Sequence, residues 1–204
     1  MDLASLKRAC RAISAKMDAS RDYLIELDSQ NGDGDLGISM SAGFAAMAEA
    51  VENSQTADLG RVFMDASRKF NAAAPSSLGT IFSIGMMGMA RALKGKTEAG
   101  TLELAQAMEA GLASIMEKAG SKPGEKTVLD ALHPAIQVLL TEPEAPDVWQ
   151  KAAAAAHAGS EATREMRSVH GRAAYYGDKS IGILDGGSVA GSLIFAAIAE
   201  AAED

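Results

Sequence analysis

Apolar residues recur every three or four positions along most of this chain, which is the spacing of one face of an α-helix. The first such stripe consists of Leu3, Leu6, Cys10, Ile13 and Met17. Comparable stripes cover residues 40–51, 59–70, 102–115, 128–139 and 148–166, and a last one begins near Ser188. Pro and Gly residues separate the stripes, and no segment alternates apolar and polar positions as a half-buried strand would. The pattern predicts an all-α protein.

Two further segments complete the expected fold. Residues 23–27 form a short stripe that leads directly into an acidic loop. Residues 76–93 are apolar nearly all round, which predicts a buried helix at the centre of the molecule. Its glycines, Gly79, Gly85 and Gly88, would let neighbouring helices approach closely. We therefore expect about eight antiparallel amphipathic helices in one bundle, forming a single domain over residues 1–204.

Composition narrows the classes of partner. The net charge is −8, and no nucleic acid or anionic membrane is expected as a partner because both need a basic face. The longest apolar run, residues 78–90, has 13 residues, whereas roughly 20 are needed to cross a bilayer. Cys10 is the only cysteine, which excludes an internal disulfide and suits a reducing compartment. No apolar leader is visible, and we expect a cytoplasmic protein.

An acidic loop with the sequence LDSQNGDGDLG, residues 27–37, carries the strongest chemical signal. Asp28, Asp33 and Asp35 lie within eight residues, and their carboxylates repel one another unless a cation neutralises them. Asp33 and Asp35 are two positions apart, so in an extended segment both can face the same point. Magnesium prefers oxygen ligands of this kind, completed by water or phosphate. The loop therefore predicts a magnesium site.

Two other interpretations of this loop explain less of it. An EF-hand beginning at Asn31 would need Gly where Leu36 stands and Glu where Ala42 stands, so it is excluded. An acidic turn that caps the following helix accounts for one aspartate and leaves two without a role.

Two stretches far from this loop could contact phosphate. Residues 71–80, NAAAPSSLGT, place small residues before a helix, whose free N–H groups suit a phosphate. An ordinary Ser cap is the simpler explanation of this stretch when it is taken alone. Residues 170–188 form a long Gly-punctuated loop that includes Arg172, and loops of that length usually serve a function.

A third stretch, GSKPGEKT at residues 120–127, approaches the sequence of a P-loop. Glu125 interrupts that pattern and no predicted strand precedes it, so a P-loop is excluded. A turn that carries Lys126 and Thr127 at a helix start is expected instead.

No nucleophile with an adjacent base is evident in the sequence. Cys10 has no nearby His, and the His residues are scattered without the spacing of metal ligands, at His133, His157 and His170. A metal–phosphate site without a general base favours phosphoryl transfer, in which positioning and charge neutralisation do most of the catalysis.

Together these stretches resemble the L subunit of dihydroxyacetone kinase, over essentially the whole chain. The motifs that carry the resemblance are LDSQNGDGDLGISM, KPGEKT followed by LDALHP, and GRAAYYGDKSIGILDGG. The resemblance implies a barrel of eight antiparallel amphipathic helices with a nucleotide at one end. It also implies a phosphotransferase of the glycerone kinase type, with an alcohol group as acceptor.

The same resemblance implies a role for each part of the site. The three loop aspartates, Asp28, Asp33 and Asp35, would hold two Mg²⁺ ions that bridge the phosphates of ADP or ATP. The residues implied along the phosphates are Leu36, Gly37, Ile38, Ser39, Ala73 and Ala74. The residues implied to close over the nucleotide are Arg172 and the turn Asp185-Gly186-Gly187.

The resemblance also implies a partner. A separate K-type subunit would bind the ketose through a histidine, so this chain would supply no catalytic residue and would be active only with that subunit. The phosphoryl donor would be ATP or a protein of the phosphotransferase system.

The chain departs from the family pattern at three places. Leu36 stands where the family usually has His, and residues 71–75 read NAAAP instead of a Gly-Gly-Ala-Ser-Gly run. The usual Asp-Pro-Gly turn is Asp185-Gly186-Gly187. The magnesium ligands are intact, whereas side-chain contacts to phosphate are fewer. The identities of the phosphoryl donor and of the ketose are therefore left open. The alternative function is a nucleotide-sensing regulatory module without turnover.

Overall fold

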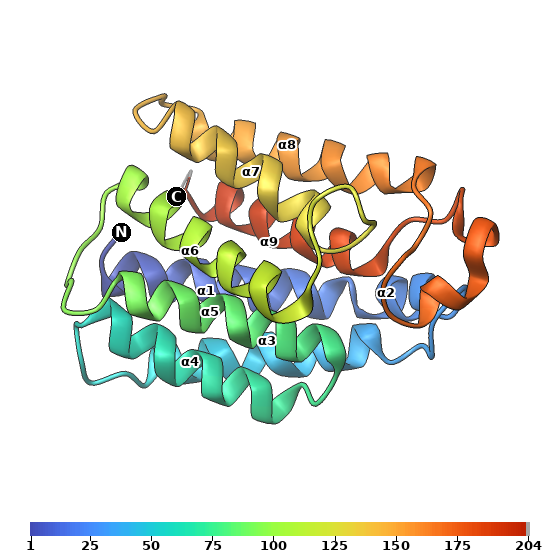
Figure 1. Ribbon diagram of the computed structural model, residues 1–204. Coiled ribbons are helices and arrows are strands. Elements are labelled where there is room, and N and C mark those ends of the chain that lie inside the picture. Colours follow the sequence, from blue (N-terminus) through green and yellow to red (C-terminus); the bar gives the residue numbers. More distant parts are fainter. Residues whose placement is uncertain (203–204) are drawn as a thin grey trace.

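The computed structural model describes residues 1–202, in which eight long helices form an antiparallel barrel (Figure 1). They are α1 (Leu3–Ala19), α3 (Leu36–Glu52), α4 (Leu59–Ala73), α5 (Ser77–Ala92), α6 (Thr101–Ala119), α7 (Leu129–Thr141), α8 (Val148–Ala162) and α9 (Gly186–Ala202). Long helices that follow one another in the chain pack together, and α1 packs against both α3 and α9, which closes the ring. The predicted all-α architecture is confirmed. No helix in this part of the chain combines the length and the apolar character that a bilayer span requires.

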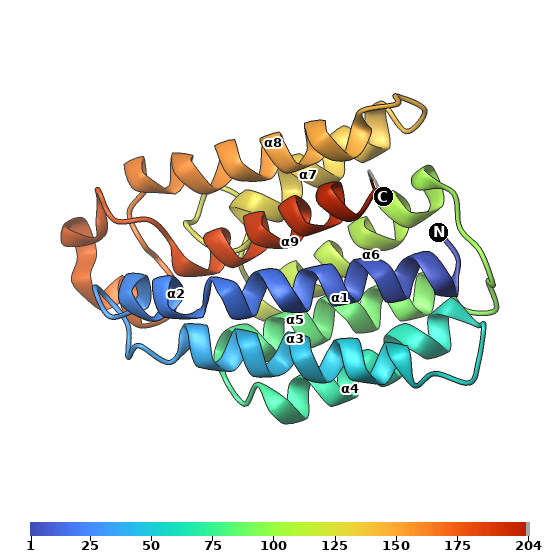
Figure 2. The same cartoon turned by 180° about the vertical axis from the view of Figure 1, so that it is seen from behind.

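Three short helices lie at one end of the barrel, namely α2 (Arg21–Asp28), η1 (Thr163–Glu165) and η2 (Arg172–Ser180) (Figure 1). Because the long helices are antiparallel, α3, α5, α7 and α9 all begin at this end, as the view from behind also shows (Figure 2). The unpaired N–H groups of four helix starts therefore face the same region. The acidic loop, which joins α2 to α3, lies in that region as well.

The expectation that residues 76–93 form a central helix is wrong. The helix α5 is one member of the barrel wall and packs between α4 and α6. Residues 81–90 are nevertheless all buried or half-buried, because one face of α5 meets the interior and its two sides meet neighbouring helices. Its apolar character therefore reflects three covered sides. The Ser cap is present, since the Gly79 amide donates to Ser76 Oγ at 3.1 Å.

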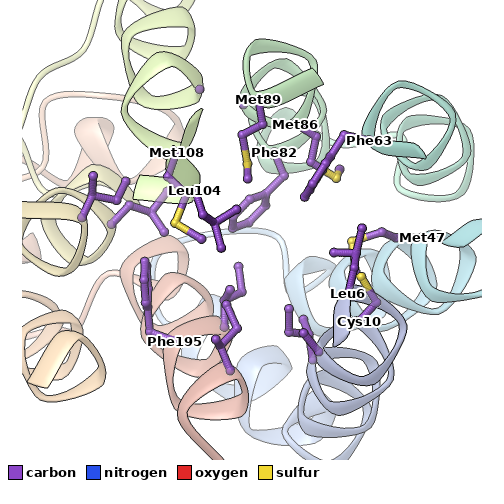
Figure 3. A pocket seen from close by; sticks show the side chains of 18 of the residues that line it. Leu6, Cys10, Met47, Phe63, Phe82, Met86, Met89, Leu104, Met108 and Phe195 are labelled. Carbon is purple, nitrogen blue, oxygen red and sulfur yellow. The ribbon is translucent and has the colours of Figure 1, made fainter. Parts of the chain in front are cut away.

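The inner faces of the helices surround an apolar cavity of about 140 Å³ (Figure 3). Aromatic, aliphatic and methionine side chains from helices around the ring line it, among them Met47, Phe82, Met108 and Phe195. Cys10 also faces this space, and burial raises the pKa of its thiol to about 12. The position of Cys10 in the core, which the first apolar stripe predicted, is confirmed.

Glycines bring α5 and α6 into close contact. A Cβ on Gly88 would lie 2.7 Å from the Cα of Gly111, and a Cβ on Gly111 would lie 2.7 Å from the carbonyl oxygen of Gly85. The two backbones therefore approach where side chains would otherwise separate them. A Cβ on Gly79 would collide with the carbonyl of Ala74, which keeps the connection between α4 and α5 tight. The close approach of a neighbouring helix is confirmed for Gly85 and Gly88, whereas Gly79 meets the connection that precedes its own helix.

Gly88→Ala is expected to lower the free energy of unfolding by about 1–3 kcal/mol, the usual range for overpacking. The added methyl group would meet Gly111 Cα, Ser114 Oγ and Ala110 O. Helix propensity alone predicts the opposite sign, since Ala is favoured over Gly by about 1 kcal/mol in a helix interior. Urea unfolding measures the difference, and Ala113→Gly at an exposed position of α6 calibrates the propensity term. A Gly88→Ala protein more stable than wild type would contradict the close packing.

Candidate functional site

The three loop aspartates meet at the end of the barrel where four long helices begin. Asp28 is the last residue of α2, and Asp33 and Asp35 lie in the loop before α3. Each carboxylate places an oxygen within 4.8 Å of the other two. Asp28 is half-buried while Asp33 and Asp35 are exposed, so the cluster opens to solvent. The structure thus brings together the side chains that the sequence singled out.

Two glycines give the acidic loop its shape. A Cβ on Gly32 would collide with Asp28 Oδ1, so no larger residue fits beside this carboxylate. Gly34 has a φ of +76°, a left-handed conformation that glycine adopts without a steric cost. The Gly34 amide donates a hydrogen bond of 2.7 Å to Asp28 Oδ2. The backbone of the loop therefore fixes the orientation of the Asp28 carboxylate.

A cation from a distant segment joins the cluster. Arg172, the first residue of η2, forms an ion pair with Asp33. The exposed fractions of the two side chains are 64% and 44%, so water screens the pair and its contribution to stability is about 0–1 kcal/mol. One guanidinium beside three carboxylates leaves the cluster with an excess of negative charge.

The turn at residues 185–187 starts α9 beside this cluster. The Ser188 amide donates a hydrogen bond of 2.6 Å to Asp185 Oδ2, which is the contact of a helix N-cap. Leu36 is buried, and a Cβ on Gly186 would lie 2.5 Å from Leu36 Cδ2. The Leu36 side chain therefore packs against the start of α9.

The carboxyl group of Asp185 is shifted toward its neutral form. Burial raises its pKa to about 7, because a charged carboxylate loses hydration there. The hydrogen bond from Ser188 opposes this rise. Nearby charges act on this pKa in both directions. The charges of Asp130 and Asp28 raise the pKa of Asp185, while the charge of Lys126 lowers it.

The residues expected along the phosphates lie at the starts of α3 and α5. Ser76 Oγ donates to Ser39 Oγ at 3.3 Å, which links the two helix starts. The Ser39 amide makes the first helical hydrogen bond of α3, to Asp35 O at 2.9 Å, so the amides before it stand outside the helical ladder. Ala74 is fully buried, backbone included, so it presents no exposed atom to a ligand in this structure. The other candidates differ in exposure, with Gly37 buried, Ala73 half-buried and Ile38 exposed.

Lys126 has a structural role that the sequence did not reveal. It is buried, its φ is +60°, and burial lowers the pKa of its ammonium group, while Asp185 opposes that shift. Its Nζ lies 2.6–3.1 Å from the carbonyl oxygens of Thr163, Met166, Ser180 and Ile183. The sequence predicted only that Lys126 lies in a turn. No local signal marks these contacts, because the partners are 37 to 57 positions further along the chain.

Two other side chains in the same turn hold neighbouring segments. Asp130 accepts hydrogen bonds from the amides of Gly124 at 2.5 Å and Thr127 at 2.7 Å. Glu125 Oε2 lies 2.6 Å from His170 Nε2, and this contact is the main cause that lowers the pKa of Glu125. His170 therefore ties the long loop to the turn at residues 120–127.

The donor set of the cluster suits a hard divalent cation. Its three carboxylates offer oxygen atoms alone, and magnesium binds through one or two such groups together with water or phosphate. The aspartates are within reach of one another, and their residual negative charge favours a cation. The residues present therefore fit magnesium.

Comparison with known proteins identifies the family. The family model of the DAK2 domain matches residues 30–200, a span that contains Asp33, Asp35, Arg172 and Asp185. This chain belongs to the DAK2 domain family. A relative in Listeria innocua, the ADP-binding subunit DhaL of PEP-dependent dihydroxyacetone kinase 1, is 30% identical over 183 residues. That match covers 90% of this chain and 88% of the relative.

Longer proteins match this chain as well. L-erythrulose kinase of Pectobacterium atrosepticum is 27% identical, and the match covers 96% of this chain and 35% of that protein. The crystal structure of the dihydroxyacetone kinase from C. freundii in complex with AMP-PNP and Mg²⁺ superposes with a TM-score of 0.78 at 27% identity. The superposition covers 97% of this chain and 34% of the chain in that crystal structure. This chain therefore spans about a third of these two proteins, and the resemblance carried by its motifs is confirmed.

The raised pKa of Asp185 predicts a pH dependence of the metal-free protein. The carboxyl group releases its proton near pH 3.8 when unfolded and near pH 7 when folded. Between these values the folded state holds more protons, so this group's contribution to the free energy of unfolding falls as the pH rises through that window. Asp185→Asn keeps an oxygen for the Ser188 amide and removes the titration.

The measurement is urea unfolding of both proteins from pH 4 to pH 8 without metal. We expect the variant to gain stability relative to wild type as the pH rises, with most of the gain complete above pH 7. A difference that stays constant across the range would show that Asp185 does not titrate in this window.

Proposed function

We propose that this chain is the phosphotransfer subunit of a short-chain ketose kinase of the dihydroxyacetone kinase type. In this proposal residues 1–204 act as one domain that holds magnesium with ADP or ATP, in the cytoplasm, and passes phosphate to a ketose held by a separate subunit. The observation that carries the proposal is the convergence of Asp28, Asp33 and Asp35 within 4.8 Å of one another. The DhaL relatives, named as ADP-binding subunits, support it.

Each part of the site has a role in this proposal. The three aspartates would hold two magnesium ions, which when bound neutralise and orient the nucleotide phosphates. Arg172 would contact the phosphates through its guanidinium, a group that matches phosphate oxygens with paired hydrogen bonds. The amides of Leu36, Gly37 and Ile38 at the start of α3 would face the phosphates as well.

The acceptor alcohol is expected to come from another subunit. The side chains described at the cluster are carboxylates and a guanidinium, and His170 is already paired with Glu125. A kinase must also hold its acceptor in line with the phosphate, and such alignment contributes much of the rate. A subunit that binds the ketose, and supplies any base, would meet both needs.

The surface around the cluster supports a docking partner. Among the described residues, six of the seven exposed large apolar side chains come from α2, from the start of α3 and from residues 163–185, all at the aspartate end. We call them the rim: Tyr23, Ile38, Val169, Tyr175, Tyr176 and Ile181. Tyr175 is 91% exposed, and exposed aromatic groups of this kind are enriched where proteins associate.

Magnesium together with ADP is expected to stabilise the protein. Ligand at about 100 times its dissociation constant adds ~2.7 kcal/mol to the free energy of unfolding. Asp35→Asn should remove this gain, while the metal-free variant should be at least as stable as wild type because one repelling charge is gone. Asp178→Asn is the matched control, since Asp178 is exposed in the same region and pairs with Arg167 instead.

Thermal unfolding with and without Mg²⁺ and ADP measures this effect for all three proteins. A wild-type melting temperature unchanged by magnesium with ADP would refute the nucleotide site. An Asp35→Asn protein that responds like wild type would show that the ligands lie elsewhere.

The isolated chain is expected to transfer no phosphate to dihydroxyacetone, and to do so only when a ketose-binding subunit is added. Tyr175→Ser together with Tyr176→Ser should reduce this partner-dependent rate at limiting partner concentration while ADP binding stays unchanged. Leu102→Ser is the control, because Leu102 is exposed at the start of α6, at the opposite end of the barrel. A coupled assay of ketose phosphorylation measures the rates.

Robust phosphorylation by the isolated chain would contradict the two-subunit account. An equal loss of rate in the Leu102→Ser protein would show that the rim has no special part in docking.

A further inference from the structure

One carboxylate of the aspartate cluster is already bound to a cation from the protein itself. Arg172 pairs with Asp33, while Asp35 has no ion pair among residues 1–202. The pair is open to water on both sides. An incoming metal ion therefore meets a cluster in which one ligand is in use, and it must compete with the guanidinium for that ligand.

The segment that carries Arg172 is held by contacts that do not involve Asp33. On one side, His170 lies two positions before Arg172 and contacts Glu125 at 2.6 Å. On the other side, the carbonyl of Ser180 at the end of η2 accepts a hydrogen bond of 2.7 Å from buried Lys126. The segment is thus tied down at both ends independently of the cluster. The segment that carries Arg172 therefore stays near the site even when the carboxylate partner of the guanidinium is taken.

We infer that Arg172 makes the binding of magnesium and the binding of nucleotide depend on each other, an inference that rests on the proposed function. Without nucleotide, a metal ion that takes Asp33 leaves the guanidinium without its anionic partner. A bound nucleotide supplies phosphate oxygens, which accept the same paired hydrogen bonds as a carboxylate. Each ligand therefore removes a cost of binding the other, and by linkage the effect is reciprocal.

This role predicts effects of opposite sign from one substitution. Removal of the guanidinium frees Asp33, so metal alone should bind more tightly. It also removes a phosphate contact, so nucleotide in the presence of metal should bind more weakly. A residue that only contacted phosphate would leave the affinity for metal alone unchanged. A residue that only held the fold would weaken both.

The test compares Arg172→Gln with wild type by calorimetric titration. One arm titrates Mn²⁺ or Mg²⁺ alone, and the other titrates ADP at saturating Mg²⁺. We expect the dissociation constant for metal alone to fall about two- to fivefold, as for the loss of one exposed ion pair. We expect the dissociation constant for ADP to rise about tenfold or more, since hydrogen bonds between charged groups contribute about 1.5–3 kcal/mol.

Two further variants control this test. Lys179→Gln removes a positive charge from the same segment, η2, at an exposed position, and it should match wild type in the metal titration. Arg172→Lys keeps the charge without the planar fork, and its affinity for metal alone should lie between those of wild type and Arg172→Gln. Thermal unfolding of each variant checks that the fold is intact.

Unchanged or weaker binding of metal alone to Arg172→Gln would overturn the inference, and so would an equal gain in Lys179→Gln. Such a result would leave the proposed function standing as long as wild type binds ADP with Mg²⁺. A wild-type protein that binds neither ligand would refute the proposed function and the inference together.

Discussion

The ammonium group of Lys126 holds the functional end of this molecule together. Burial of a charged amine is costly, and here four backbone carbonyls between residues 163 and 183 surround it. An ammonium group has three N–H donors, so four acceptors within 3.1 Å must share them. The segment between residues 163 and 183, which has little regular structure, is thereby held in one conformation. Arg172 lies inside that segment and Asp185 lies just beyond it, so Lys126 helps to place both residues.

The barrel and its loops contribute differently to the site. Close packing through glycines, such as Gly88 against Gly111, gives a wall in which four helix starts are held at one end. The ligand atoms themselves come from connections, with Asp33 and Asp35 before α3 and Arg172 between α8 and α9. Loops that carry function on a rigid scaffold are a common arrangement. In this chain the connections are themselves anchored by buried polar groups, so the site needs little ordering when a ligand arrives.

Much of this arrangement could be predicted from the sequence, because it rests on local patterns. Helix positions follow from the spacing of apolar residues, and the meeting of Asp28 with Asp33 and Asp35 follows from their closeness in the chain. The Lys126 cage could not be predicted, since its partners are distant and are backbone atoms without a sequence signature. The place of α5 was also misjudged, because a wall helix covered on three sides has the same composition as a central one. Spacing shows how apolar a helix is, but not which neighbours cover it.

The interior cavity gives the molecule a sensitivity to hydrostatic pressure. A void of about 140 Å³ corresponds to about 84 mL per mole, which is comparable to the volume decreases of about 20–100 mL/mol that accompany the unfolding of proteins. Apolar cavities of this kind stay dry, so unfolding removes a volume that water does not fill in the folded protein. Compression therefore favours the unfolded chain. The flexible methionine side chains along the wall, among them Met47 and Met108, would be the first to move into the empty volume.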